Sequence, residues 1–277
     1  MDTTFALSRQ GKKLVRIVAE AAGVPPSDVV DFELSLYDVT PPMLGGADEE
    51  FIYSARLDNL LSCYCAVEAL IANADDAAED PNVRVIGLFD NEEVGSASVP
   101  GAGGPFLDEV LRRITAVSPA PSVDPVPSLV ELQAMAMRRS LLVSIDMAHA
   151  AHPNYPGKHD RAHRPRLNGG IVIKGNVNQR YATSTLSATA VRRAAAASDC
   201  KVQEFVIKQS LGCGSTIGPI LASSLGFAKV VDVGIAQLSM HASTEICGSH
   251  DVEPTVNLLD NLFRTWPQLD AAMKGTD

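Results

Sequence analysis

Positive charge is scarce in this chain of 277 residues, and the chain contains no long apolar run. Lys and Arg number 23 against 33 Asp and Glu, which gives a formal net charge of −10 at pH 7. Nucleic acids and anionic membrane surfaces attract proteins through an excess of positive charge, so we expect neither as a partner. No apolar stretch reaches the roughly 18 residues that a membrane span requires. These features favour a protein in solution.

The few cysteines also lack any pattern. There are five, an odd number, and none has zinc-ribbon spacing or the layout of a disulfide framework. We therefore expect reduced thiols, as in a cytoplasmic protein. The first residues contain no apolar segment of the kind found in secretory signals, which agrees with a cytoplasmic location. The cysteines are Cys63, Cys65, Cys200, Cys213 and Cys247.

What is present indicates a large globular domain with a short appendage. Hydrophobic residues make up 46% and charged residues 20%, an ordinary globular composition. Residues 4–22 have helical periodicity and end at glycine and proline, whereas residues 32–37 alternate with the period of a strand. A boundary rich in proline and glycine follows. We therefore treat residues 1–50 as an appendage and residues 51–277 as the main domain.

In the main domain, short apolar strands alternate with helical stretches. This alternation predicts an α/β fold in which a mainly parallel or mixed sheet is sandwiched by helices. The predicted strands are residues 83–89, 141–145, 172–173 and 230–235, and the predicted helices are residues 60–72, 106–114, 187–197, 217–225 and 256–266.

Side chains able to bind metal follow four of the apolar runs. In open α/β sheets, ligands bind outside the carboxyl ends of the strands, where side chains from distant segments can meet. Oxygen and nitrogen donors without thiolate suit a hydrolytic zinc, or manganese or cobalt. The residues are Asp58 after the run at 51–53, Glu92 and Glu93 after 85–89, Asp146 after 142–145 and His241 after 233–236.

Each of these residues also has an ordinary structural interpretation. An acid after a strand, such as Asp58 or Asp146, is commonly a helix N-cap or a solvated turn residue. The adjacent Glu92 and Glu93 fit a charged turn, and a single histidine such as His241 often has a purely structural role. Their joint occurrence along one chain favours a metal centre.

Five motifs, in order along the chain, resemble the signatures of the aspartyl aminopeptidase family. The resemblance extends over nearly the whole chain. It implies the zinc-peptidase (phosphorylase/hydrolase-like) architecture, release of N-terminal Asp and Glu from peptides, and a homo-oligomer built from dimers. The motifs are RLDN at 56–59, DNEEVGS at 90–96, SIDMAHAAHPNY at 144–155, GSTIGPILAS at 214–223 and QLSMH at 237–241.

The resemblance also implies a centre of two zinc ions. By position, Asp58 bridges both metals, Glu93 and His241 complete one site, and Asp146 binds the second metal. Glu92 corresponds to the general base. Two metals can share and activate a water molecule, and an adjacent glutamate can carry its proton to the leaving amine.

Three more residues correspond to positions around the substrate. Lys174 and Tyr181 resemble residues that the family places near the substrate's side-chain carboxylate, and His149 resembles another active-site position. A lysine at this place would supply the positive charge that an acid-selective pocket needs in an acidic protein. The other interpretation of Lys174 and Tyr181 is an ordinary pair at a strand end.

Members of the family are longer at the N-terminus. Residues 1–50 resemble the tail of an inserted dimerisation domain, and the segment that precedes it in the family carries the first strands and a histidine ligand of the second zinc. Unless His149, His152 or a partner chain replaces that ligand, we therefore expect a protein with one zinc or with poor activity, or an incomplete gene product. Two alternatives stay open: a non-catalytic pseudoenzyme or assembly subunit, and a hydrolase of the same fold with another N-terminal specificity.

Overall fold

The computed structural model describes residues 9–75, 80–118, 122 and 124–273, and the chain divides into two compact units, residues 1–39 and 40–277. The smaller unit contains helix α2 (Lys12–Ala22) and the short 3-10 helix η1 (Pro26–Asp28). Val15 and Ala19 form the buried side of α2, and Gly23 ends it in the left-handed conformation with φ of 70°. The predicted helix is confirmed over this range, and its residues 4–8 lie outside the described residues.

The strand predicted at residues 32–37 is wrong, because no β-strand forms there. Leu34 and Leu36 lie on the same side of the predicted alternation, yet these residues are 59% and 103% exposed. The alternation therefore has no buried face to stabilise a strand. Strands β1 (Met43–Gly45) and β2 (Phe51–Ser54) both lie in the larger unit and pair with each other. The origin of residues 1–50 in a dimerisation domain stays a prediction.

A four-stranded mixed sheet forms the centre of the larger unit, in the order β3-β7-β5-β6. The outer pairs are parallel, and the central pair of β7 and β5 is antiparallel. The strands are β3 (Leu141–Ile145), β5 (Ile171–Lys174), β6 (Val202–Phe205) and β7 (Lys229–Gly234). Three of them match predicted strands. The strand predicted at residues 83–89 is wrong, because this segment joins no ladder within the part of the chain that the structure describes.

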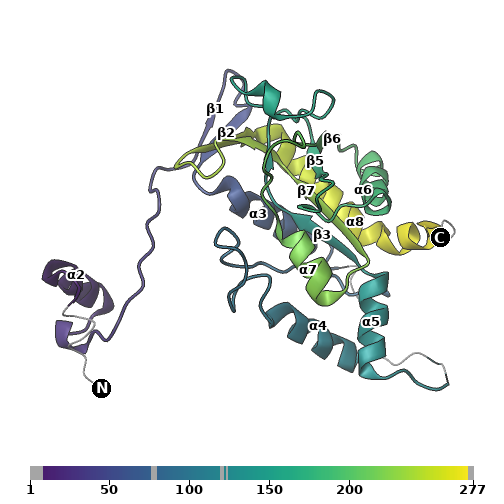
Figure 1. Cartoon of the computed structure of the whole chain (residues 1–277), viewed down its shortest axis with the longest axis horizontal. Coiled ribbons are helices and arrows are strands. Elements are labelled where there is room, and N and C mark those ends of the chain that lie inside the picture. Colours follow the sequence, from purple (N-terminus) through teal and green to yellow (C-terminus); the bar gives the residue numbers. More distant parts are fainter. Residues whose placement is uncertain (1–8, 76–79, 119–121, 123, 274–277) are drawn as a thin grey trace. The chain divides into compact units, whose positions relative to one another are not determined.

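Helices cover both faces of this sheet, as Figure 1 shows. Along β3, Val143 packs into the core that α3, α6 and α8 share, whereas Leu142 packs on the other side with α4 and α7. Alternate strand residues point to opposite faces, so this division places helices on each side. The helices are α3 (Leu57–Ala72), α4 (Phe106–Val117), α6 (Thr185–Ala197), α7 (Ile217–Leu225) and α8 (Val252–Met273), which confirms the five predicted helices.

The sequence did not predict the remaining elements. Helix α5 (Leu129–Arg139) begins at a capping box between Ser128 and Glu131. A second sheet has the order β1-β2-β9-β8-β4, where β4 is Ala148–His149, β8 is Ala236–Leu238 and β9 is Glu245–Gly248. Strands β3 and β7 each continue into this sheet after one or two residues, as β4 and β8. The two sheets therefore meet where the central strands end.

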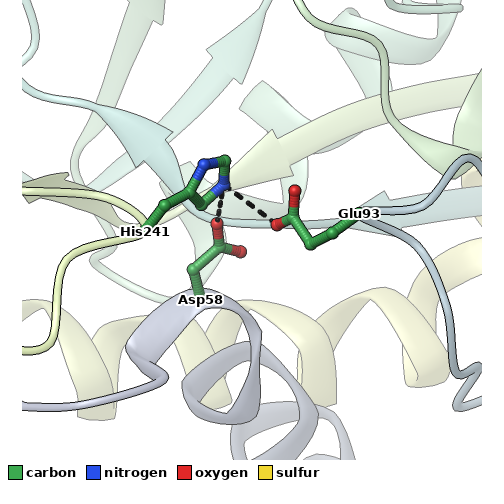
Figure 2. Close-up of side chains that lie close together, drawn as sticks. All are labelled: Asp58, Glu93 and His241. Atoms are coloured by element: carbon green, nitrogen blue, oxygen red, sulfur yellow. Dashed lines mark ion pairs between the residues drawn. The ribbon is translucent and has the colours of Figure 1, made fainter. Parts of the chain in front are cut away.

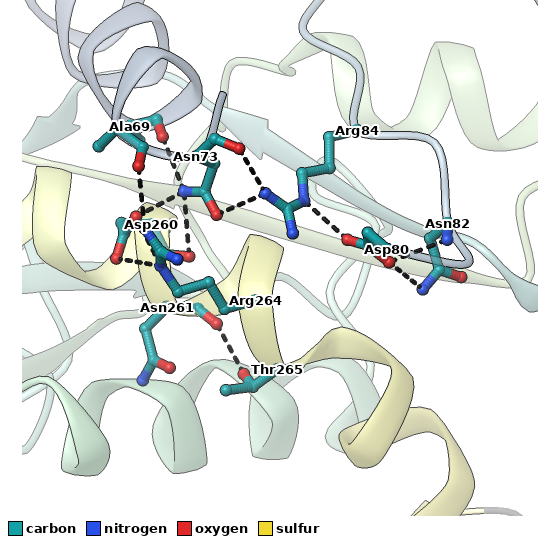
Figure 3. Close-up of polar contacts among 10 residues, drawn as sticks. Ala69, Asn73, Asp80, Asn82, Arg84, Asp260, Asn261, Arg264 and Thr265 are labelled. Carbon is teal, nitrogen blue, oxygen red and sulfur yellow. Dashed lines mark hydrogen bonds and ion pairs between the residues drawn. The ribbon is translucent and has the colours of Figure 1, made fainter. Parts of the chain in front are cut away.

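A polar network ties the end of α3 to residues 80–84 and to α8 (Figure 3). The Arg84 guanidinium donates to both the main-chain and side-chain oxygens of Asn73 at 2.8 Å, and to Asp80 at 2.7 Å. Asn73 in turn donates to the Ala69 carbonyl and to Asp260 of α8. The network anchors the segment that leads to Glu92 and Glu93.

Among the helices in the described ranges, none is long and apolar enough to cross a membrane.

Candidate metal centre

Asp58, Glu93 and His241 converge at one point (Figure 2), where one ligand atom from each lies within 4.8 Å of the others. His241 Nε2 is 3.2 Å from Asp58 Oδ2 and 2.9 Å from Glu93 Oε1. The side chain of Asp58 is 6% exposed, whereas those of Glu93 and His241 are about 60% exposed. Two carboxylates and an imidazole are a donor set that fits zinc and leaves a coordination position open. The cluster is thus anchored in the protein and open to solvent.

Local structure brings each side chain to this point. Asp58 lies at the start of α3, directly after β2, and its main chain is not yet helical. Glu93 lies in a tight turn closed by hydrogen bonds from Gly95 to Glu92 and from Ser96 to Asn91, each 2.9 Å long. His241 lies in the connection between β8 and β9, with a left-handed φ of 67°.

Crowded negative charge surrounds Asp58. The pKa of Asp58 is raised to about 8, mainly by burial and also by the neighbouring carboxylates of Asp146, Glu93 and Glu245. Like charges brought together in a buried site are unfavourable unless a cation compensates them. The chemistry of the site therefore suits a bound cation.

Asp146 lies in the link between β3 and β4 and pairs with a buried lysine. Lys174 Nζ is 3.0 Å from Asp146 Oδ2 and donates to the Met147 carbonyl at 2.7 Å, and Lys174 is 2% exposed. Lys174 therefore neutralises part of the charge on Asp146 in this structure. Gly234, at the end of β7, packs so tightly on this link that an added Cβ would overlap the carbonyl oxygen of Asp146.

Glu92 occupies the same turn as Glu93, next to the cluster. The pKa of Glu92 is raised to about 7, first by burial and then by the charges of Asp146 and Glu93. Lys174 and His241 oppose that rise. A carboxyl group whose pKa lies near neutrality can both accept and donate a proton at physiological pH.

Tyr181 and His149, two other predicted site residues, lie near Lys174 rather than within the cluster. The ring of Tyr181 is 5.5 Å from Lys174 Nζ, and burial raises the pKa of this phenol, which is therefore neutral. Burial, and then the charge of Lys174, lowers the pKa of His149 on β4. The ring of His152 packs against that of Tyr155, with the ring centroids 5.1 Å apart and the planes tilted by 44°. Neither histidine joins Asp58, Glu93 and His241 in the cluster found among the described residues.

Glu245 and Asn59 make positioning contacts that the sequence did not predict. Glu245 accepts hydrogen bonds from the main-chain N–H groups of both Asp58 and His241. Asn59 donates from its side-chain amide to the Ile145 carbonyl at 2.9 Å, which links the start of α3 to the end of β3. Asn59 stood within the RLDN motif, whereas nothing in the sequence distinguishes Glu245 from a solvated acid.

The fold and the site together define an α/β protein with the donor set of a hydrolytic zinc centre. Residues 2–263 match the family described as aminopeptidase I zinc metalloprotease (M18). The chain therefore belongs to the M18 aminopeptidase family.

Curated relatives and solved structures agree with this membership. The chain is 43% identical to a probable aspartyl aminopeptidase of Ricinus communis over 97% of its own length and 54% of the relative's. It is 46% identical to a probable M18 family aminopeptidase 2 of Ectopseudomonas mendocina, over 88% and 52% of the two chains. The chain spans about half the length of the curated relatives that it matches.

Two solved structures have the same fold. One is the cryo-EM structure of the Ape4 and Nbr1 complex, with a TM-score of 0.85, 39% identity, and coverage of 94% of this chain and 49% of the other. The second is the S. cerevisiae mApe1 dodecamer, with a TM-score of 0.80, 33% identity, and coverage of 94% and 56%.

Proposed function

We propose that this chain carries the zinc centre of an aminopeptidase that releases acidic residues from peptide N-termini. The observation that carries the proposal is the convergence of Asp58, Glu93 and His241 beside Glu92. Membership of the M18 family supports zinc as the metal. The relative named a probable aspartyl aminopeptidase supports the preference for acidic residues.

The residues divide the work of peptide hydrolysis. Asp58, Glu93 and His241 would hold a zinc ion, which supplies Lewis-acid polarisation of the scissile carbonyl and lowers the pKa of water. Glu92 accepts the proton of the attacking water and donates it to the leaving amine. Its raised pKa suits both steps near neutral pH.

Asp146 is the proposed ligand of a second zinc, shared with Asp58. Among the residues that the structure describes, these two side chains give the companion site fewer donors than the three of the first site, so we propose that it binds zinc more weakly. Lys174 would then serve two groups, since it already pairs with Asp146 and is the proposed partner of an acidic substrate side chain. Tyr181 and His149 complete the proposed substrate pocket. A homo-oligomer is the proposed assembly, supported by the dodecamer of the related mApe1.

The test is turnover of an N-terminal aspartyl amide by the 277-residue chain, with the zinc content of each sample measured. We expect hydrolysis that Glu92→Gln lowers by at least about 100-fold, because the variant keeps the shape of Glu92 but cannot take up the proton. The control is zinc content, which the variant should retain. Bound zinc without turnover in the wild-type chain would instead favour the non-catalytic subunit.

A further inference from the structure

Glu245 is a buried carboxylate that contacts two members of the metal cluster through their main chains. It is the first residue of β9 and is 1% exposed. Its Oε2 accepts the N–H of Asp58 at 2.8 Å, and its Oε1 accepts the N–H of His241 at 2.7 Å. One side chain therefore joins two ligand-bearing segments that are far apart in the sequence.

Both segments have irregular main chains at this point. Asp58 has φ of −84° and ψ of 106° within the first turn of α3, and His241 has a positive φ. Neither conformation is maintained by an α-helical or β-ladder hydrogen bond pattern. Hydrogen bonds from a main-chain N–H to a carboxylate are stronger than bonds between neutral groups, so Glu245 is well suited to hold both segments.

We infer that Glu245 is a positioning residue that sets the spacing of the Asp58 carboxylate and the His241 ring for metal binding. This inference rests on the proposed zinc site. Groups that orient metal ligands contribute to affinity without touching the metal, and their loss commonly costs about 10- to 100-fold in affinity. Glu245 acts on the ligands' main chains, which leaves their side chains available to the ion.

Asp251 provides a matched control, because it is another buried carboxylate that accepts hydrogen bonds from two main-chain N–H groups. It is also 1% exposed, and its two oxygens accept the main-chain N–H groups of Asn168 and Gly170 at 2.7 Å. Neither of these partners belongs to the metal cluster. Asp251→Asn therefore removes the same kind of contact at a place where metal affinity should not depend on it.

The experiment measures zinc affinity of the metal-free chain by competition with a chromophoric chelator. We expect Glu245→Gln, which loses one acceptor oxygen, to weaken zinc binding by about 10- to 100-fold. Glu245→Asp keeps both oxygens and should recover part of that loss. Asp251→Asn should lower the thermal midpoint while it leaves the zinc affinity unchanged. Equal affinity in Glu245→Gln and wild type, or an equal loss in Asp251→Asn, would overturn the inference.

Amide hydrogen exchange of the metal-free chain provides a second measurement that needs neither zinc nor activity. Glu245→Gln should accelerate exchange at the amides of Asp58 and His241, and Asp251→Asn should not. Unchanged exchange at both amides would contradict the role of Glu245. A wild-type chain that binds no zinc would refute the proposed function, whereas exchange would still show whether Glu245 holds the two segments.

Discussion

At the scale of single residues, this protein buries carboxylates against main-chain N–H groups. Asp232 in β7 is an example away from the metal cluster: it is fully buried, and it accepts the Ala182 N–H at 2.6 Å and the Thr216 hydroxyl. Burial nevertheless dominates and raises the pKa of Asp232 above its usual 3.8. The folded protein therefore binds a proton at this residue more tightly than the unfolded chain does.

That difference predicts a pH dependence of stability. Asp232 contributes most to the free energy of unfolding below pH 3.8, and this contribution is lost as the pH rises through the raised pKa. Asp232→Asn cannot titrate. Urea unfolding in the presence of a chelator should therefore show the wild type gaining stability relative to Asp232→Asn as the pH falls from about 7 to about 4. A difference that grows in the opposite direction would contradict this account.

Residues of the candidate site were predictable where they follow apolar strands or lie in characteristic motifs. Asp58, Glu93 and His241 were found in this way, and the structure brings them together. Glu245 was not found, because its importance comes from burial and from contacts between distant segments. The pairing of Lys174 with Asp146 was missed for the same reason.

At the scale of elements, long helices and the buried central strands could be predicted from periodicity. The second sheet could not, because its strands contain two to four residues and offer too short a pattern. Residues 83–89 are apolar and suggested a strand, but strand formation depends on a partner that lies elsewhere in the sequence. This segment is instead anchored at its start by the Arg84 network (Figure 3).

Removal of that anchor should destabilise the fold. Arg84 and Asp80 have side-chain exposures of 9% and 6%, so their ion pair and the bonds to Asn73 are shielded from water. We expect Arg84→Met to lower the free energy of unfolding by about 1–3 kcal/mol in chemical denaturation. Arg112→Met breaks an exposed pair with Asp108 one helical turn away and should cost under about 0.5 kcal/mol. Similar losses in the two variants would show that the network adds little.

At the scale of the whole molecule, the metal cluster joins two segments of the second sheet, one after β2 and one between β8 and β9, to the turn at residues 90–96. Zinc that binds only the folded chain should therefore stabilise all of it. At a free zinc concentration about 100 times the Kd, the gain is about 2.7 kcal/mol, which should appear as a rise in the thermal midpoint that a chelator reverses. Magnesium at the same concentration should have little effect, because it favours an octahedral set of oxygen ligands. A midpoint that zinc leaves unchanged would contradict the proposed site.

The close approach of Gly234 to the Asp146 carbonyl has a consequence for how this site can change during evolution. Where two main chains touch, no side chain lies between them to be enlarged or trimmed. The distance between the end of β7 and the segment that carries Asp146, between β3 and β4, is thus determined by the thickness of the peptide groups themselves. Diversification of the pocket must then come from residues on the exposed side that do not bind the metal, such as His149, while the distance between these two main chains stays constant.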